Sequence, residues 1–170
     1  ECFTYSLVTM PDNPLDDLTP IYSCPSDPNS GRVSDSPLGQ HAPGSYPGVS
    51  GDTPTSKNGI FYVDSATRFR DVIDGLSSTI AVGERGIPKA LNIGWTLCGS
   101  TQDSFVDMQI GLIPGDANGT HTDHFWSWHT GGAHFLLGDG AVRFLSDTTD
   151  HKVLVDLSTR SGQEVLSGDF

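Results

Sequence analysis

The sequence predicts an α+β domain, a globular unit rich in antiparallel β-sheet with one C-terminal helix and long surface loops. Twenty glycines and 11 prolines among 170 residues disfavour long helices and favour short strands joined by turns. Two alternating apolar runs around residue 138 have the pattern of a hairpin, and one segment after residue 150 has helical spacing. The length is that of a single domain.

The hairpin is the clearest of these elements. Residues 133–137 and 141–145 alternate in polarity on either side of Gly138-Asp139-Gly140, which has the composition of a short hairpin turn. Cross-strand pairs of large apolar side chains stabilise such a unit. The face that we expect them to form combines four residues: Phe135, Leu137, Val142 and Phe144.

One helix is expected after the hairpin. Thr149 or Asp150 can cap its start, and Gly162 can end it in the left-handed conformation. Its apolar positions have helical spacing: Val153, Leu154 and Leu157.

The rest of the chain divides into an extended N-terminal arm, residues 1–23, and a globular domain, residues 24–170. Prolines interrupt the arm, and residues 24–58 are mostly loop. The shorter elements expected are strands at Gly59–Val63, Thr79–Val82, Ile93–Leu97 and Glu164–Leu166, a helical turn at Phe69–Ile73, and a short strand or helix within Phe105–Ile113.

The charge balance limits the partners. Twenty-one acidic residues against nine basic ones give a formal net charge of −12. A phosphate backbone would be repelled, so we expect no nucleic acid partner. No run of 18 apolar residues occurs, so we expect no stable membrane span in this chain.

Three cysteines, Cys2, Cys24 and Cys98, raise the question of disulfides. In an oxidising compartment, Cys24 can pair with Cys2 or with Cys98, and the sequence does not choose between them. The alternative is three free thiols. None of the spacings is C-x-x-C, so the cysteines do not indicate a zinc site.

Four histidines lie close together in the sequence: His121, His124, His129 and His134. None of their spacings forms H-E-x-x-H, and no helix is expected there to align them. We therefore expect surface or hydrogen-bonded histidines rather than a transition-metal site.

An acidic loop is a candidate calcium site. Asp116, Asn118 and Thr120 offer oxygen ligands at alternate positions, and Asp123 follows them. The pattern matches only half of an EF-hand loop, so an Asx-rich turn is the alternative. Asn118-Gly119-Thr120 is also an N-glycosylation sequon.

No arrangement of residues indicates catalysis, so we do not expect an enzyme. No serine lies in a G-x-S-x-G elbow, and no carboxylate pair has the pattern of a glycosidase. The segment from Asp74 to Thr79 has the composition of a turn whose Asp and Ser side chains bond nearby backbone.

Five blocks in order resemble one family, the pilin-like proteins abundant in planctomycete-type bacteria. The resemblance runs from Cys24 to Phe170, and its signature residues include His129, Asp139 and Gly140 of H-x9-D-G, and Asp74, Gly75, Ser77, Thr79 and Glu84 of the preceding block. The other blocks are C-P-S-D-P at 24–28, N-G-I-F-Y at 58–62, and T-R-S-G-x-E-V at 159–165.

The resemblance implies a pilin- or pseudopilin-like globular domain that forms an extracellular or cell-surface filament with like subunits. It also implies an N-terminal helix, which we expect to be lacking here because Pro11 and Pro14 interrupt the arm. Related pseudopilin domains bind calcium, which agrees with the acidic loop. His129 and Asp139 are expected to act separately, one before the first hairpin strand and one in its turn.

The alternative is a secreted solute- or glycan-binding module. Five aromatic residues are candidates for stacking on a ligand: Trp95, Trp126, Trp128, Tyr46 and Tyr62. A core or interface role for the tryptophans is the competing interpretation.

Overall fold

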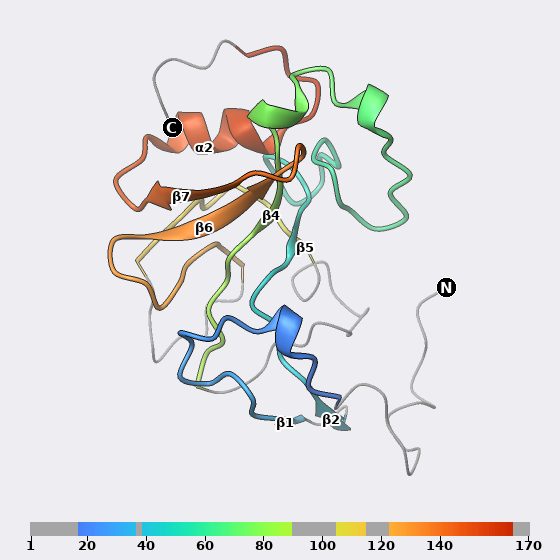
Figure 1. Ribbon diagram of the computed structural model, residues 1–170. Helices are drawn as coiled ribbons and strands as arrows, with labels where there is room; N and C mark the ends of the chain where they lie inside the picture. The colour runs from blue at the N-terminus through green and yellow to red at the C-terminus, as the bar shows by residue number, and fades with distance from the viewer. Residues whose placement is uncertain (1–16, 37–38, 90–104, 115–122, 165–170) are drawn as a thin grey trace.

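The structure, a computed structural model, describes residues 17–36, 39–89, 105–114 and 123–164 (Figure 1). The elements in chain order are η1 (Pro20–Tyr22), β1 (Ser34–Ser36), β2 (Gly39–His41), β3 (Gly48–Val49), η2 (Phe69–Asp71), η3 (Leu76–Ser78), β4 (Ile80–Gly83), β5 (Phe105–Val106), β6 (Gly132–Leu137), β7 (Val142–Ser146) and α2 (His151–Ser158).

The main sheet has five strands in the order β5-β3-β4-β6-β7, and β1 and β2 form a separate two-stranded sheet. Neighbouring strands are antiparallel except for β3 and β5, which are parallel. The predicted α+β class is therefore confirmed, with a mixed sheet rather than a purely antiparallel one.

Helix α2 packs on one face of this sheet, and Figure 1 shows it lying along β6 and β7. Alternation along β6 buries Ala133, Phe135 and Leu137 toward the helix, because successive strand residues point to opposite faces. The core between the layers is apolar and comprises Val49, Ile80, Val106, Met108, Leu112, Phe125, Ala133, Phe135, Leu137, Leu145, Leu154 and Leu157.

The hairpin forms as predicted, but its faces differ from the prediction. Phe135 lies opposite Arg143, while Val142 lies opposite Leu136 and Phe144 opposite His134. Val142 and Phe144 therefore lie on the outward face of the sheet, away from Phe135. The turn is the Gly-Asp-Gly triplet itself, because Leu137 N donates to Ala141 O and Gly140 N donates to Leu137 O. A three-residue turn places Leu137 opposite Ala141, so Val142 and Phe144 point to the other face.

The predicted helix is also present, and it ends earlier than expected. Asp150 caps its start, since its side chain accepts from the N–H of Lys152 at 2.7 Å. The helix ends at Ser158 rather than at Gly162, and the left-handed residue nearby is Gln163, with φ 59°. Tertiary hydrogen bonds to residues 159–163, described below, replace the helical ones.

The predicted strand at Gly59–Val63 is wrong. Gly59 and Phe61 donate to the carbonyls of Ser50 and Val49, beside β3, but the chain then turns between Tyr62 and Ser65. The strand at Thr79–Val82 and the helical turn at Phe69–Ile73 are confirmed as β4 and η2.

Residues 24–58 are largely irregular, as expected, although they include β1, β2 and β3. The described end of the N-terminal arm is bonded to this region, because Tyr22 O accepts from Ser45 N at 2.7 Å. Within Phe105–Ile113 only the two residues of β5 form a strand.

Several expectations lie outside the described residues: the strand at 93–97, most of the arm 1–23, and all but the first residue of the strand at 164–166. Among the residues that are described, no helix is both long and apolar enough to cross a membrane.

Candidate functional site

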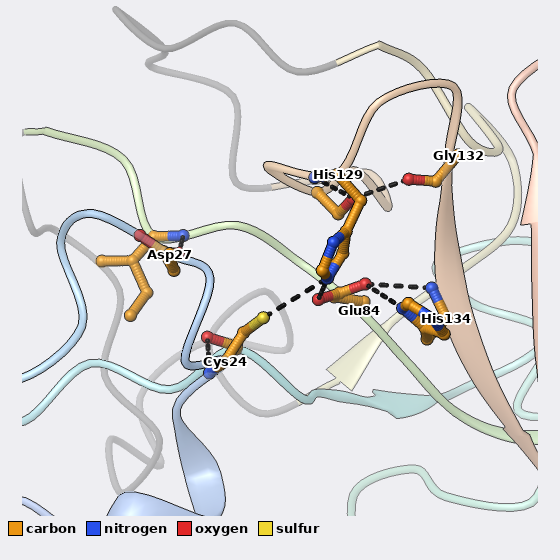
Figure 2. A network of polar contacts seen from close by, with 9 residues as sticks. Cys24, Asp27, Glu84, His129, Gly132 and His134 are labelled. Carbon is orange, nitrogen blue, oxygen red and sulfur yellow. Dashed lines mark hydrogen bonds and ion pairs between the residues drawn. The ribbon is translucent and has the colours of Figure 1, made fainter.

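A buried polar cluster lies at the end of β4, where Glu84 follows the strand (Figure 2). Its side chain is 2% exposed. Figure 2 shows Cys24, His129 and His134 gathered around its carboxylate, although they come from separate segments of the chain. A carboxylate buried in this way needs polar partners to offset its lost hydration.

The two oxygens of Glu84 have different partners. Oε2 accepts from the backbone N–H of His134 at 2.9 Å and lies 3.3 Å from Nδ1 of the same residue. Oε1 lies 3.2 Å from Nε2 of His129. The two imidazole rings pack edge to face with their centroids 4.8 Å apart. His134 thus holds one oxygen, and the other faces His129.

The Cys24 thiol is buried and faces the same histidine nitrogen. Its Sγ lies 3.5 Å from His129 Nε2. Burial, followed by a hydrogen bond with Glu84, raises the pKa of the thiol. Burial, followed by the neighbouring Cys24, also raises the pKa of Tyr46, so its hydroxyl stays protonated near the sulfur. Reactive thiolates have the opposite environment, which lowers their pKa.

Two serines fix the backbone that carries the cysteine and the histidine. Cys24 N donates to Ser45 Oγ at 3.0 Å, and His129 N donates to Ser127 Oγ at 2.9 Å. Ser127 Oγ in turn donates to the carbonyl of Gly132 at 2.6 Å, at the start of β6. Hydrogen bonds to the two serines therefore fix the backbone positions of Cys24 and His129.

The C-P-S-D-P loop is attached to the segment after Glu84 through Asp27. Its Oδ2 accepts from Ile87 N at 2.6 Å and its Oδ1 from Asn29 N at 2.8 Å. Asn29 Nδ2 donates to the Ile87 carbonyl at 2.8 Å. Burial raises the pKa of Asp27, while these backbone hydrogen bonds act in the opposite direction. The loop that carries Cys24 is thereby placed beside Glu84.

A second polar region, which we call the C-terminal clamp, comprises Arg160, Asp74 and the backbone groups they bind. Arg160 Nη1 donates to the carbonyls of Lys57 and Gly59, each at 2.7 Å, and its backbone N–H donates to Asn58 O at 2.9 Å. Its guanidinium lies 5.4 Å from the ring centroid of Tyr62. Charge-assisted bonds of this kind are among the stronger ones in proteins.

Asp74 completes the clamp from the other side. Its carboxylate accepts from the N–H groups of Gly162 and Gln163, both at 2.7 Å, and Ile73 N donates to the Arg160 carbonyl at 2.7 Å. The expectation that Asp74 bonds nearby backbone is wrong for these contacts, because its partners lie 88 and 89 residues further along the chain.

The other signature residues of this block shape local turns. Gly75 has φ +95°, a conformation that favours glycine. Thr79 is buried, and its Oγ1 donates to the Gly75 carbonyl at 3.1 Å. Ser77 lies exposed within η3.

Asp139 and Gly140 lie at the opposite end of β6 from His129. Asp139 Oδ1 accepts from Ala141 N at 2.9 Å, and Gly140 has φ +90°. These two residues shape the β6–β7 turn, whereas His129 precedes β6 and faces Glu84.

The four clustered histidines do not form one site. His129 and His134 meet at the buried carboxylate, whereas His124 Nδ1 lies 3.3 Å from Asp123 Oδ1. His121 lies outside the described residues.

The predicted calcium loop stays a prediction. Asp123 is its one described member, and its carboxylate contacts His124. The other members, which include the sequon asparagine, lie outside the described residues: Asp116, Asn118 and Thr120.

Cys24 is free and forms no disulfide in the structure. Its two predicted partners, Cys2 and Cys98, lie outside the described residues.

Sequence reasoning named Cys24, Glu84 and His129 but did not bring them together. Each lies in a different family block, 45 residues or more from the next along the chain, and the cysteine spacing argued against a zinc site. The available signal was chemical: three blocks each carry one residue type that ligates metals. The fold alone places these side chains at one point.

The class of protein defined by these features is an α+β domain with a buried thiol, carboxylate and imidazole cluster. A family model described as a protein of unknown function, DUF1559 (SBP_bac_10), matches residues 4–152. The chain therefore belongs to the DUF1559 family. No curated protein and no solved structure matches it.

Proposed function

We propose that the protein is an extracellular structural subunit of a pilus, pseudopilus or other cell-surface filament, and that it acts without catalysis. The ordered blocks that resemble pilin-like proteins support this proposal. The observation that carries it is the outward apolar face of β7, where Val142 is 63% exposed and Phe144 is 46% exposed.

Strand β7 ends the described sheet, because within the described residues it pairs only with β6. A strand at the end of a sheet presents unpaired backbone groups to which another chain can add. Exposed apolar side chains on such a strand favour association, since covering them removes apolar surface from water. A second copy of the chain, bound along β7, is the occupant that filament growth requires.

Electron microscopy of the purified full chain tests this proposal. We expect filaments or ordered oligomers, and we expect Phe144→Lys to prevent their formation while leaving the fold intact. Phe69→Lys is the matched control, because Phe69 is 77% exposed but lies in η2 rather than on β7. Only dispersed monomers across salt and calcium concentrations would count against the filament role.

A second candidate, a solute- or glycan-binding module, is favoured by one pocket. Its volume is about 130 Å³, and Tyr62 and Phe105 line it together with Lys57, Asp107 and others. Trp126 does not contribute a stacking surface, because it is buried in the core against Trp128.

The size of this pocket suits a small polar ligand rather than an oligosaccharide. Calorimetry against a panel of sugars and short peptides would test it, with Tyr62→Ala expected to weaken any binding. If no sugar or peptide in the panel binds, the filament role is left as the single candidate.

A further inference from the structure

The side chains of Cys24, Glu84 and His129 converge on one point, although they come from three separate segments of the chain. Their Sγ, carboxylate oxygen and ring nitrogen all lie within 4.8 Å of one another. His129 Nε2 faces both Cys24 Sγ, at 3.5 Å, and Glu84 Oε1, at 3.2 Å. Thiol sulfur, carboxylate oxygen and imidazole nitrogen are the donor atoms with which proteins bind transition-metal ions.

A cysteine–histidine–acid catalytic arrangement does not fit this geometry. Such an arrangement places the nucleophile at one ring nitrogen and the orienting acid at the other. Here the thiol and the carboxylate face the same nitrogen, Nε2. The Cys24 thiol is also buried, which disfavours the thiolate that a nucleophile needs.

We propose that Cys24, Glu84 and His129 form a binding site for a divalent transition-metal ion, Zn²⁺ in preference. A single cation placed among the three would bond the sulfur, the oxygen and the nitrogen lone pair at once. Zn²⁺ binding displaces the thiol proton to solvent. The proposal holds whether or not the chain assembles into filaments.

The two separations from His129 Nε2 agree with a tetrahedral ion. Typical zinc bonds are about 2.3 Å to sulfur, about 2.0 Å to nitrogen and about 2.1 Å to carboxylate oxygen. At tetrahedral angles these lengths place sulfur about 3.5 Å and oxygen about 3.3 Å from the nitrogen. The separations from His129 Nε2 are 3.5 Å to Cys24 Sγ and 3.2 Å to Glu84 Oε1.

Each ligand is oriented by a further hydrogen bond, as metal ligands usually are. His134 holds Glu84 Oε2 through its backbone N–H and its Nδ1, which leaves Oε1 directed at the site. Ser45 Oγ accepts from the backbone of Cys24, and Ser127 Oγ from the backbone of His129. The three donors are therefore positioned before an ion arrives.

The donor set selects the class of ion. Sulfur, imidazole nitrogen and one carboxylate oxygen suit Zn²⁺ or Co²⁺, whereas Ca²⁺ and Mg²⁺ require oxygen ligands throughout. The three ligands found among the described residues leave a fourth position for water or for another group. His129 is 26% exposed and lines a pocket of about 60 Å³, so the site is not sealed from solvent.

The proposal is tested on the full 170-residue chain, reduced and freed of metal with a chelator. Calorimetric titration with Zn²⁺ is expected to give one tight site per chain. Titration with Co²⁺ is expected to produce the near-ultraviolet charge-transfer band of a cobalt–thiolate bond, together with visible absorption of tetrahedral intensity. Absence of stoichiometric Zn²⁺ binding by the wild-type chain would overturn the proposal.

Variants separate this site from nonspecific binding to an acidic surface. Cys24→Ser should abolish the cobalt–thiolate band, and His129→Ala should weaken Zn²⁺ binding more than about 100-fold, the upper end of what outer residues contribute. His134→Gln should weaken it by about 10–100-fold and retain the band. His151→Ala is the matched control and should bind as the wild type does, because His151 contacts the carbonyls of Met108 and Gln109 instead.

Two results would contradict the assignment of these ligands. One is Zn²⁺ binding that is unchanged in Cys24→Ser and His129→Ala, each shown to be folded by circular dichroism. The other is mass spectrometry of the native protein that finds Cys24 in a disulfide, since an oxidised sulfur cannot supply the thiolate.

Discussion

The two polar regions of this protein place a carboxylate in opposite situations. In the C-terminal clamp, Asp74 accepts from two backbone N–H groups, and Arg160 donates to two backbone carbonyls. In the cluster at the end of β4, Glu84 faces histidine nitrogens, one of which it shares with a thiol.

The difference indicates what each region does. Backbone partners have a fixed protonation state, so the clamp can be fully satisfied by folding alone and serves to join distant segments. The side-chain partners at the β4 cluster are residue types that ligate metals, so that region can respond to an ion. The clamp is therefore expected to affect stability under all conditions, and the cluster to affect it when metal is present.

The largest effect is expected in the clamp. Arg160→Ala should lower the free energy of unfolding by about 2–4 kcal/mol, because it removes two charge-assisted hydrogen bonds and a cation–π contact. Urea denaturation followed by circular dichroism would measure this. Arg70→Ala is the control, since Arg70 is exposed and its contact with Asp71 at 3.9 Å should contribute less than about 1 kcal/mol. Equal losses of unfolding free energy in Arg160→Ala and Arg70→Ala would show that the clamp does not stabilise the fold more than a surface ion pair does.

Zinc should produce the next largest effect. At free Zn²⁺ about a hundredfold above its dissociation constant, the wild type should gain about 2.7 kcal/mol of stability. Cys24→Ser should gain far less, while Arg160→Ala should show the full increment on a lower baseline. Thermal melts with and without Zn²⁺ would measure these increments. A clamp variant that loses the zinc response would mean that the two regions are not separate.

A smaller loss is expected at the other half of the clamp. Asp74→Ala should destabilise the fold by about 1–2 kcal/mol, because the N–H groups of Gly162 and Gln163 lose their acceptor but can reach water. Amide hydrogen exchange should quicken at these two positions and remain unchanged at His134. Uniform acceleration across both regions would instead indicate global destabilisation.

The smallest effect is expected at Asp107, a partly buried carboxylate that belongs to neither the clamp nor the β4 cluster. It measures how much burial of a carboxylate alone reduces stability. Burial raises the pKa of Asp107, with Asp123 and Asp52 adding to the effect. The folded state therefore holds the proton more tightly than the unfolded chain, and ionisation of Asp107 opposes folding at neutral pH.

Asp107→Asn should accordingly stabilise the protein at pH 7 by less than about 1 kcal/mol, and it keeps the acceptor for Gln109 N. The difference should disappear as pH falls below the unfolded value of 3.8, where both forms are neutral. Denaturation at pH 7 and pH 3 would check the sign. A variant less stable than the wild type at pH 7 would show that the Asp107 charge has a favourable partner.

Local patterns in the sequence predicted the elements whose signals are local. Period-two alternation around the Gly-Asp-Gly turn predicted β6 and β7, and Asp150 with helical apolar spacing predicted α2. The predicted hairpin faces were wrong because the three-residue turn places Leu137 opposite Ala141, so Val142 and Phe144 point to the face opposite that of Phe135 and Leu137. A register shift of one residue leaves the composition unchanged but moves every side chain of the strand to the other face of the sheet.

The sequence by itself determined that this chain forms an acidic, turn-rich α+β domain with a C-terminal hairpin and helix, because glycine content, charge and periodicity are properties of neighbouring residues. Only the tertiary structure decided that Asp74 binds the C-terminal segment and that Cys24, Glu84 and His129 meet at one point. Their separations of 60 and 45 residues along the chain carry no distance information. The strand order places β4 beside β6, and Asp27 fixes the loop of Cys24 next to the segment after Glu84. These two features bring the three side chains together and so create the site.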